Sequence, residues 1–123
     1  MAGTLVANTI NTDTGLFSTN NAYSGIAKAW VNFAGASGTV NGSFNVSSVT
    51  RNSIGDYSIN FTTAMPNANY AVSGMGVDYS FGGVFVISSN AGSQTTALIR
   101  VLTLQKGNAY YDPTIMTVTV NGA

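Results

Sequence analysis

Residues 27–72 decide the fold, and they read AKAWVNFAGASGTVNGSFNVSSVTRNSIGDYSINFTTAMPNANYAV. Apolar and polar side chains alternate in short runs, and Gly, Asn, Ser or Pro interrupts each run. A period of two is typical of strands that are buried on one face, and the interrupting residues are those that tight turns prefer. The stretch therefore predicts short antiparallel strands joined by turns.

Two runs show this alternation most clearly. In residues 27–33 (AKAWVNF) the small and apolar residues at odd positions share one face, and Trp30 lies on the other. In residues 56–61 (DYSINF) the same spacing turns Tyr57, Ile59 and Phe61 toward a core. Because Trp30 lies opposite small alanines, its indole needs a second apolar partner, which a subunit interface would provide.

Further runs extend the same pattern to the end of the chain. Residues 84–87 are continuously apolar, which suits a strand buried on both faces. Turns are expected at residues 53–55 and at residues 65–67 (MPN), where proline cannot donate to a strand ladder. A helical period of useful length is missing, and strands at intervals of about 8–12 residues are typical of sandwiches. We expect residues 26–123 to form an all-β domain, a single antiparallel β-sandwich or jelly-roll-like fold, with further strands at 40–49, 70–77, 84–87, 95–104 and 115–120.

The composition excludes several kinds of chemistry. A chain of 123 residues forms one domain that buries roughly two thirds of its unfolded surface, so it needs no disulfide or metal to fold. It has no Cys, His or Glu, which removes thiolate metal sites, thiol nucleophiles and the imidazole that most often acts as general base. We therefore expect no catalytic residue, no cofactor and no metal.

Charge is equally scarce, with four Asp against four Lys and Arg. Four scattered cations cannot neutralise a row of phosphates, so nucleic acid is not an expected partner. No apolar run reaches the roughly 20 residues of a membrane helix, and residues 1–25 lack the features of a secretory signal, so we expect no membrane insertion. A nearly uncharged surface favours association, and we expect a closed homo-oligomer; the alternative is a neutral but soluble monomer.

Residues 1–25 differ from the rest of the chain. Leu5, Val6 and Ile10 are expected to form one short strand, and the polar, turn-rich sequence that follows has few apolar anchors. We interpret the segment as an extended arm for docking or trimerisation, and the alternative is a frayed terminus. The candidate docking or interface residues are Leu5, Val6, Ile10, Leu16, Phe17 and Trp30.

The four aspartates are the remaining candidates for acid–base chemistry. A glycosidase needs two carboxylates about 5–10 Å apart. Each Asp, however, lies in or beside a turn, where its side chain bonds the backbone. The serines have no histidine to accept a proton, and no nucleophile-elbow motif is present. The interpretation of Asp13, Asp56, Asp78 and Asp112 as turn residues is therefore the stronger one.

Two segments instead suggest recognition. Residues 78–83 (DYSFGG) and 106–113 (KGNAYYDP) each combine aromatic residues, a charge and flexible residues in an expected loop. Aromatic rings provide rigid contact area, and neighbouring amides provide adaptable hydrogen bonds to a sugar or a protein. The alternative is that these rings cover the core or pack between subunits. The candidate contact residues are Asp78, Tyr79, Phe81, Tyr110 and Tyr111.

The central stretch also resembles a known module. KAWVNF (28–33), SFNVSSV (43–49), GDYSINF (55–61) and TAMPNANY (63–70) are similar to a module at the receptor-facing end of bacteriophage tail-fibre and related virion proteins. The resemblance implies a trimeric head without catalytic residues. The chain departs from the pattern at Arg51, where relatives carry an acidic or amide residue, and it has no long N-terminal shaft.

The resemblance sets the functional expectation. We expect a non-enzymatic phage virion structural protein, a trimeric tail-fibre or adhesin module on the particle surface, made in the bacterial cytoplasm without a signal peptide. The alternative is a capsid decoration or head-fibre protein, whose arm would clamp capsid subunits. A small sugar-binding lectin and an aspartate glycosidase are more distant alternatives. The expected partners are copies of itself, the tail or major capsid protein, and a host-surface glycan or protein.

Overall fold

The computed structural model describes residues 3–7, 9–12, 15–18, 25–78, 84–88, 92–105 and 107–122. Its named elements are all β-strands, so the expected all-β class is confirmed. In chain order they are β1 (Thr9–Thr12), β2 (Gly15–Ser18), β3 (Ala27–Phe33), β4 (Val40–Phe44), β5 (Val46–Ser53), β6 (Asp56–Phe61), β7 (Tyr70–Val77), β8 (Val84–Ser88), β9 (Leu98–Gln105), β10 (Ala109–Tyr110) and β11 (Ile115–Gly122).

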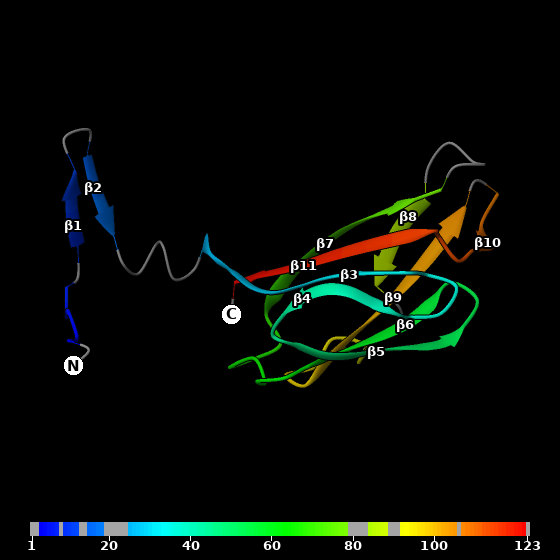
Figure 1. The fold of residues 1–123 in the computed structure, drawn as a ribbon, viewed down its shortest axis with the longest axis horizontal. Helices are drawn as coiled ribbons and strands as arrows, with labels where there is room; N and C mark the ends of the chain where they lie inside the picture. The colour runs from blue at the N-terminus through cyan, green and yellow to red at the C-terminus, as the bar shows by residue number, and fades with distance from the viewer. Residues whose placement is uncertain are drawn as a thin grey trace.

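Nine of these strands form one antiparallel sheet in the order β4-β3-β11-β7-β8-β9-β6-β5, with β10 paired to β9. The first long strand, β3, pairs with the last, β11, in the register Val31↔Val118. The pairing between neighbouring strands of this sheet is weakest between β7 and β8, where Gly76↔Val84 is the single pair among the described residues. There the sheet bends over, so that β4, β3, β11 and β7 form one layer and β9, β6 and β5 form the other (Figure 1).

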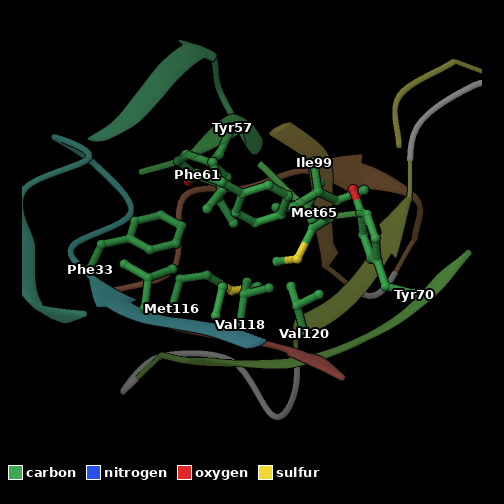
Figure 2. Close-up of a cluster of buried hydrophobic side chains, with 13 residues drawn as sticks. Phe33, Tyr57, Phe61, Met65, Tyr70, Ile99, Met116, Val118 and Val120 are labelled. Atoms are coloured by element: carbon green, nitrogen blue, oxygen red, sulfur yellow. The ribbon is translucent and has the colours of Figure 1, made fainter. Parts of the chain in front are cut away.

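The arrangement is sandwich-like, because one core fills the space between the two layers. Figure 2 shows Phe33, Met116 and Val118 pointing from β3 and β11 toward Tyr57 and Ile99 of the opposite layer. The rings of Phe33 and Tyr57 meet edge to face, with their centroids 5.0 Å apart. A jelly roll has two separate sheets, whereas here β8 joins both layers in one hydrogen-bonded path.

The strand pattern agrees with the sequence where the alternation is strict. In β6 the side chains of Tyr57, Ile59 and Phe61 are buried, as expected. In β11 Met116, Val118 and Val120 are buried on one face. The period of two therefore identified the inward residues correctly in both layers.

The expected strand over residues 40–49 is wrong as a single element. It divides at Asn45 into β4 and β5, because Asn45 takes a left-handed conformation with φ 53°. Its side chain secures this break: Oδ1 accepts a hydrogen bond from the Thr63 N–H (2.7 Å), and Nδ2 donates to the Lys28 carbonyl (3.1 Å). Asn tolerates this conformation better than most residues do.

The expected single strand through Leu5, Val6 and Ile10 is also wrong. Ile10 lies in β1, which pairs with β2 as a two-stranded antiparallel hairpin, while Leu5 and Val6 lie outside any strand and are largely exposed. Leu16 and Phe17 lie in β2; the side chains of both strands are outside the described structure. Figure 1 draws this hairpin apart from the nine-stranded sheet.

Candidate functional site

The outer surface of the layer β4-β3-β11-β7 is the largest candidate site, and we call it the β11 face. Directly opposite residues in antiparallel strands share a face. Trp30 lies opposite Phe44 and Thr119, and Thr117 lies opposite Met75. Because the alternate residues of β3 and β11 are buried, all of these side chains point outward. The β11 face consists of Lys28, Trp30, Asn32, Gly42, Phe44, Ser73, Met75, Val77, Ile115, Thr117 and Thr119.

Large apolar side chains are unusually open on this face. The exposed fractions are 42% for Trp30, 55% for Phe44 and 64% for Met75, and Val77 is exposed as well. Lys28 is the single charged residue among those that define the face. An exposed, contiguous apolar area on a small protein usually marks a binding surface.

Trp30 lies flat against the neighbouring strand. A Cβ atom built on Gly42 would lie 3.6 Å from Cζ3 and 3.7 Å from Cη2 of the indole, so the six-membered ring covers the glycine. Beside it, the Asn41 amide donates from Nδ2 to Oδ1 of Asn32 (3.0 Å). The outward direction expected for Trp30 is confirmed, and its role at an interface stays a prediction.

The outer surface of β5, β6 and β9, which we call the β6 face, is different. Its polar side chains bond one another: Asn60 donates from Nδ2 to Ser48 Oγ (3.0 Å), and Asn52 donates to Ser58 Oγ (2.9 Å). The remaining members of the β6 face are Thr50 of β5, Asp56 of β6, and Leu98, Arg100 and Leu102 of β9, of which the two leucines are half-buried.

Asp56 and Arg100 form an ion pair on the β6 face. The Arg100 Nε donates to Asp56 Oδ1 (2.8 Å), and Nη2 forms a second bond to Oδ2. The hydrogen bond from Arg100 lowers the pKa of the Asp56 carboxyl and outweighs the effect of its burial. The polar groups of this face are therefore bonded to one another, and its exposed part suits contact with water.

A third cluster closes the end of the domain around Asp112. Its Oδ1 accepts hydrogen bonds from the Gly55 N–H (2.9 Å) and the Tyr57 hydroxyl (2.6 Å), and its Oδ2 accepts two from Arg51 (3.1 and 2.6 Å). Burial alone would raise the pKa of Asp112, but these donors together lower it. Burial, with the adjacent Asp112 carboxylate, raises the pKa of the Tyr57 hydroxyl. Arg51, where the chain departs from the resembled module, thus holds residues 107–113 against the β5–β6 turn.

One described residue of each expected recognition segment, Asp78 and Tyr111, lies beside the other. Asp78, at the end of β7, forms a hydrogen bond with the Tyr111 side chain and so raises the pKa of the Tyr111 hydroxyl. The Tyr111 N–H donates to the Thr103 carbonyl (3.2 Å), which anchors the loop to β9. Tyr110, in β10, is more than half exposed. Tyr79 and Phe81 lie outside the described residues.

A glycosidase general acid needs a raised pKa to stay protonated. The pKa values of Asp56 and Asp112 are instead lowered by hydrogen bonds from their arginine partners. Asp13 lies outside the described residues. Within the described ranges, no cluster of three or more His, Cys, Asp or Glu could hold a metal ion. That same part of the chain contains no helix with the length and hydropathy of a membrane span.

Sequence reasoning missed the exposed apolar members of the β11 face other than Trp30. Phe44, Met75 and Val77 were not candidates, although all three are large apolar residues on the outward side of their strands. The signal was present in residues 70–77 (YAVSGMGV), where Met75 and Val77 alternate with two glycines and fall on the side opposite the buried Tyr70.

Comparison with known proteins gives no match: no family model, no curated protein and no solved structure is significantly similar to this chain.

Proposed function

We propose that this protein is a non-enzymatic structural protein of a bacteriophage particle, a trimeric tail-fibre or adhesin-type module on the particle surface. The observation that carries the proposal is the open, almost uncharged β11 face, with Trp30, Phe44 and Met75 uncovered in the single chain. A face of this kind needs a covering partner. Residues 28–70 resemble a trimeric virion module, and this resemblance is the reason for proposing a trimer of identical chains as the assembly that covers the face.

The end of the domain that carries Asp78 and Tyr111 is the proposed contact with the host. The Asp112 cluster holds this loop rigidly, which lowers the entropy cost of binding. Tyr110 projects from it into solvent. A rigid loop with an exposed aromatic ring suits recognition of a sugar or a protein surface.

Residues 1–25 are proposed to dock the module to the particle. Leu5 and Val6 are exposed apolar residues ahead of the β1–β2 hairpin, so they can be buried only against another surface. This observation also favours a second candidate function, a capsid decoration or head-fibre protein, in which the same segment would bind the assembled shell. Deleting residues 1–24 should abolish attachment to the particle and leave the far-UV spectrum of the β-sheet unchanged.

Immunogold electron microscopy of intact particles tests the proposal. Antibody raised against this chain is applied to purified particles, and antibody absorbed with the pure protein serves as control. Label confined to the tail supports the fibre or adhesin function, and label spread over the head supports decoration of the capsid. Absence of label above the absorbed control, with this chain also missing from the particle by mass spectrometry, would contradict both.

A further inference from the structure

We propose that the β11 face is the surface through which copies of this chain pack around a threefold axis, with Trp30, Phe44 and Met75 in the contact. The inference rests on the proposed function, because it names the surface that makes the proposed trimer. It goes beyond that function in assigning the contact to one layer of the domain.

The first step is the exposure of the face. Trp30 and Phe44 face each other across β3 and β4, and Met75 lies on β7, two strands from Trp30. Aromatic residues and methionine are enriched in the buried centre of protein interfaces, where charged residues are depleted. The β11 face has that composition. The β6 face carries the Asp56–Arg100 ion pair and serine and asparagine bonded to each other, and its two leucines, Leu98 and Leu102, are half-buried.

The second step is the charge. Residues that lie on a threefold axis meet their own copies, so like charges there would repel one another. Lys28 is the one charged member of the β11 face, and it lies two residues before Trp30, near the beginning of β3. The rest of the face, including Phe44 and Met75, is uncharged and can lie near the axis without repulsion between charges.

The third step is the size. The four strands have 5, 7, 8 and 8 residues and lie about 4.8 Å apart, which gives a flat area of about 440 Å² before the relief of the side chains is added. A standard interface buries about 800 Å² of accessible surface on each partner. A sugar ring stacked on Trp30 would leave Met75 open about 10 Å away across two strand spacings. A second copy of the chain therefore fits the whole face better than a glycan does.

The test compares two lysine substitutions on opposite faces of the same fold. Met75→Lys places three like charges in the proposed contact, and Thr50→Lys places the same charge on the exposed β6 face as the matched control. Native mass spectrometry and sedimentation give the assembly state, and circular dichroism confirms that each variant is folded. We expect Met75→Lys to weaken the trimer by at least about a hundredfold in concentration and Thr50→Lys to leave it unchanged.

Trp30, the single tryptophan of the chain, gives a second measurement that needs no variant. Its emission in the wild-type protein should shift to longer wavelength as dilution separates the subunits. A trimer that persists in folded Met75→Lys, or dissociates without any change in Trp30 emission, would overturn the inference and leave the virion function standing. A wild-type monomer whose Trp30 emission responds only to added oligosaccharide would overturn it in favour of a sugar-binding face.

Discussion

The β11 face and the β6 face are built from the same kind of strand, yet they expose different chemistry: the large apolar side chains are exposed on the first, whereas Leu98 and Leu102 of the second are half-buried. On the β6 face, Asn60 bonds Ser48 and Arg100 bonds Asp56, so the polar groups already have partners. On the β11 face, Trp30 and Met75 have large open areas. Both layers must turn apolar residues inward to make one core. The outward residues are free of that requirement, so they carry the information about function.

The largest expected effect concerns the core on which both faces depend. Phe33 is fully buried in the β3 layer and contacts Tyr57 of the β6 layer. Phe33→Ala should lower the free energy of unfolding by about 4 kcal/mol. Denaturation followed by circular dichroism and by Trp30 emission should give coincident transitions. Separate transitions would mean that the two layers are not one cooperative unit.

The next effect separates the Asp112 cluster from the surface ion pair. Asp112→Asn removes the carboxylate that accepts bonds from Arg51, Tyr57 and the Gly55 N–H. We expect a loss of about 2 kcal/mol in the free energy of unfolding, because hydrogen bonds to a partly buried charge are strong. Urea denaturation at pH 7 measures it. A loss no larger than that of Asp56→Asn would contradict the structural role of this cluster.

The pH dependence follows from the same two carboxylates. The pKa values of Asp56 and Asp112 are lowered in the folded state, so the unfolded state binds protons first as the pH falls. Their stabilisation is therefore fully present above about pH 5 and is lost as the pH falls below about 4 through the folded pKa values. The midpoint urea concentration, measured as a function of pH, should fall less steeply below about pH 4 in Asp112→Asn than in the wild type. The same fall in both proteins would mean that other groups cause the loss of stability in acid.

A smaller effect is expected for the ion pair of the β6 face. Asp56→Asn removes the charge that pairs with Arg100, which is about half exposed. The Asp56 carboxyl is itself buried, but its partner Arg100 stays in contact with water, so the free energy of unfolding should fall by about 1 kcal/mol. The proposed trimer should be unaffected, as sedimentation would show. A variant that loses assembly would place the subunit contact on the wrong face.

The smallest effect on stability is expected at Tyr110. Because this side chain projects into solvent, Tyr110→Ala should change the free energy of unfolding by less than about 0.5 kcal/mol. Adsorption of particles carrying the variant to host cells should nevertheless fall, with Thr50→Ala on the β6 face as the control. Unchanged adsorption would remove Tyr110 from the proposed receptor contact.

The sequence predicted the strands well where alternation alone sets them. The inward residues of β3 and β6 followed from a period of two, which depends only on side-chain direction. The break at Asn45 was missed because asparagine can continue a strand or leave it, and its bond from the distant Thr63 N–H decides the outcome. The β1–β2 hairpin was missed because the apolar residues near it are few.

The site was predictable only in part. The composition of residues 106–113 indicated a loop, but the pairing of Asp112 with Arg51 joins residues 61 positions apart and depends on tertiary structure. Asp78 and Tyr111 are likewise far apart in the sequence, and the tertiary structure brings them into contact. Periodicity assigned Trp30 to an outward face, but the strand order places Phe44 and Met75 beside it. Such order is set by long-range pairing, which local patterns do not contain.

Oxidative footprinting of the purified protein tests the contrast between the faces most directly. Hydroxyl radicals oxidise exposed side chains, and mass spectrometry reports the rate at Met75, Trp30 and Tyr110 separately. Comparing concentrated protein with protein diluted to single chains, we expect the rates at Met75 and Trp30 to fall several-fold on assembly while the rate at Tyr110 stays the same. If the chain assembles and Met75 and Trp30 are oxidised as fast as in the single chain, the β11 face is not the subunit contact.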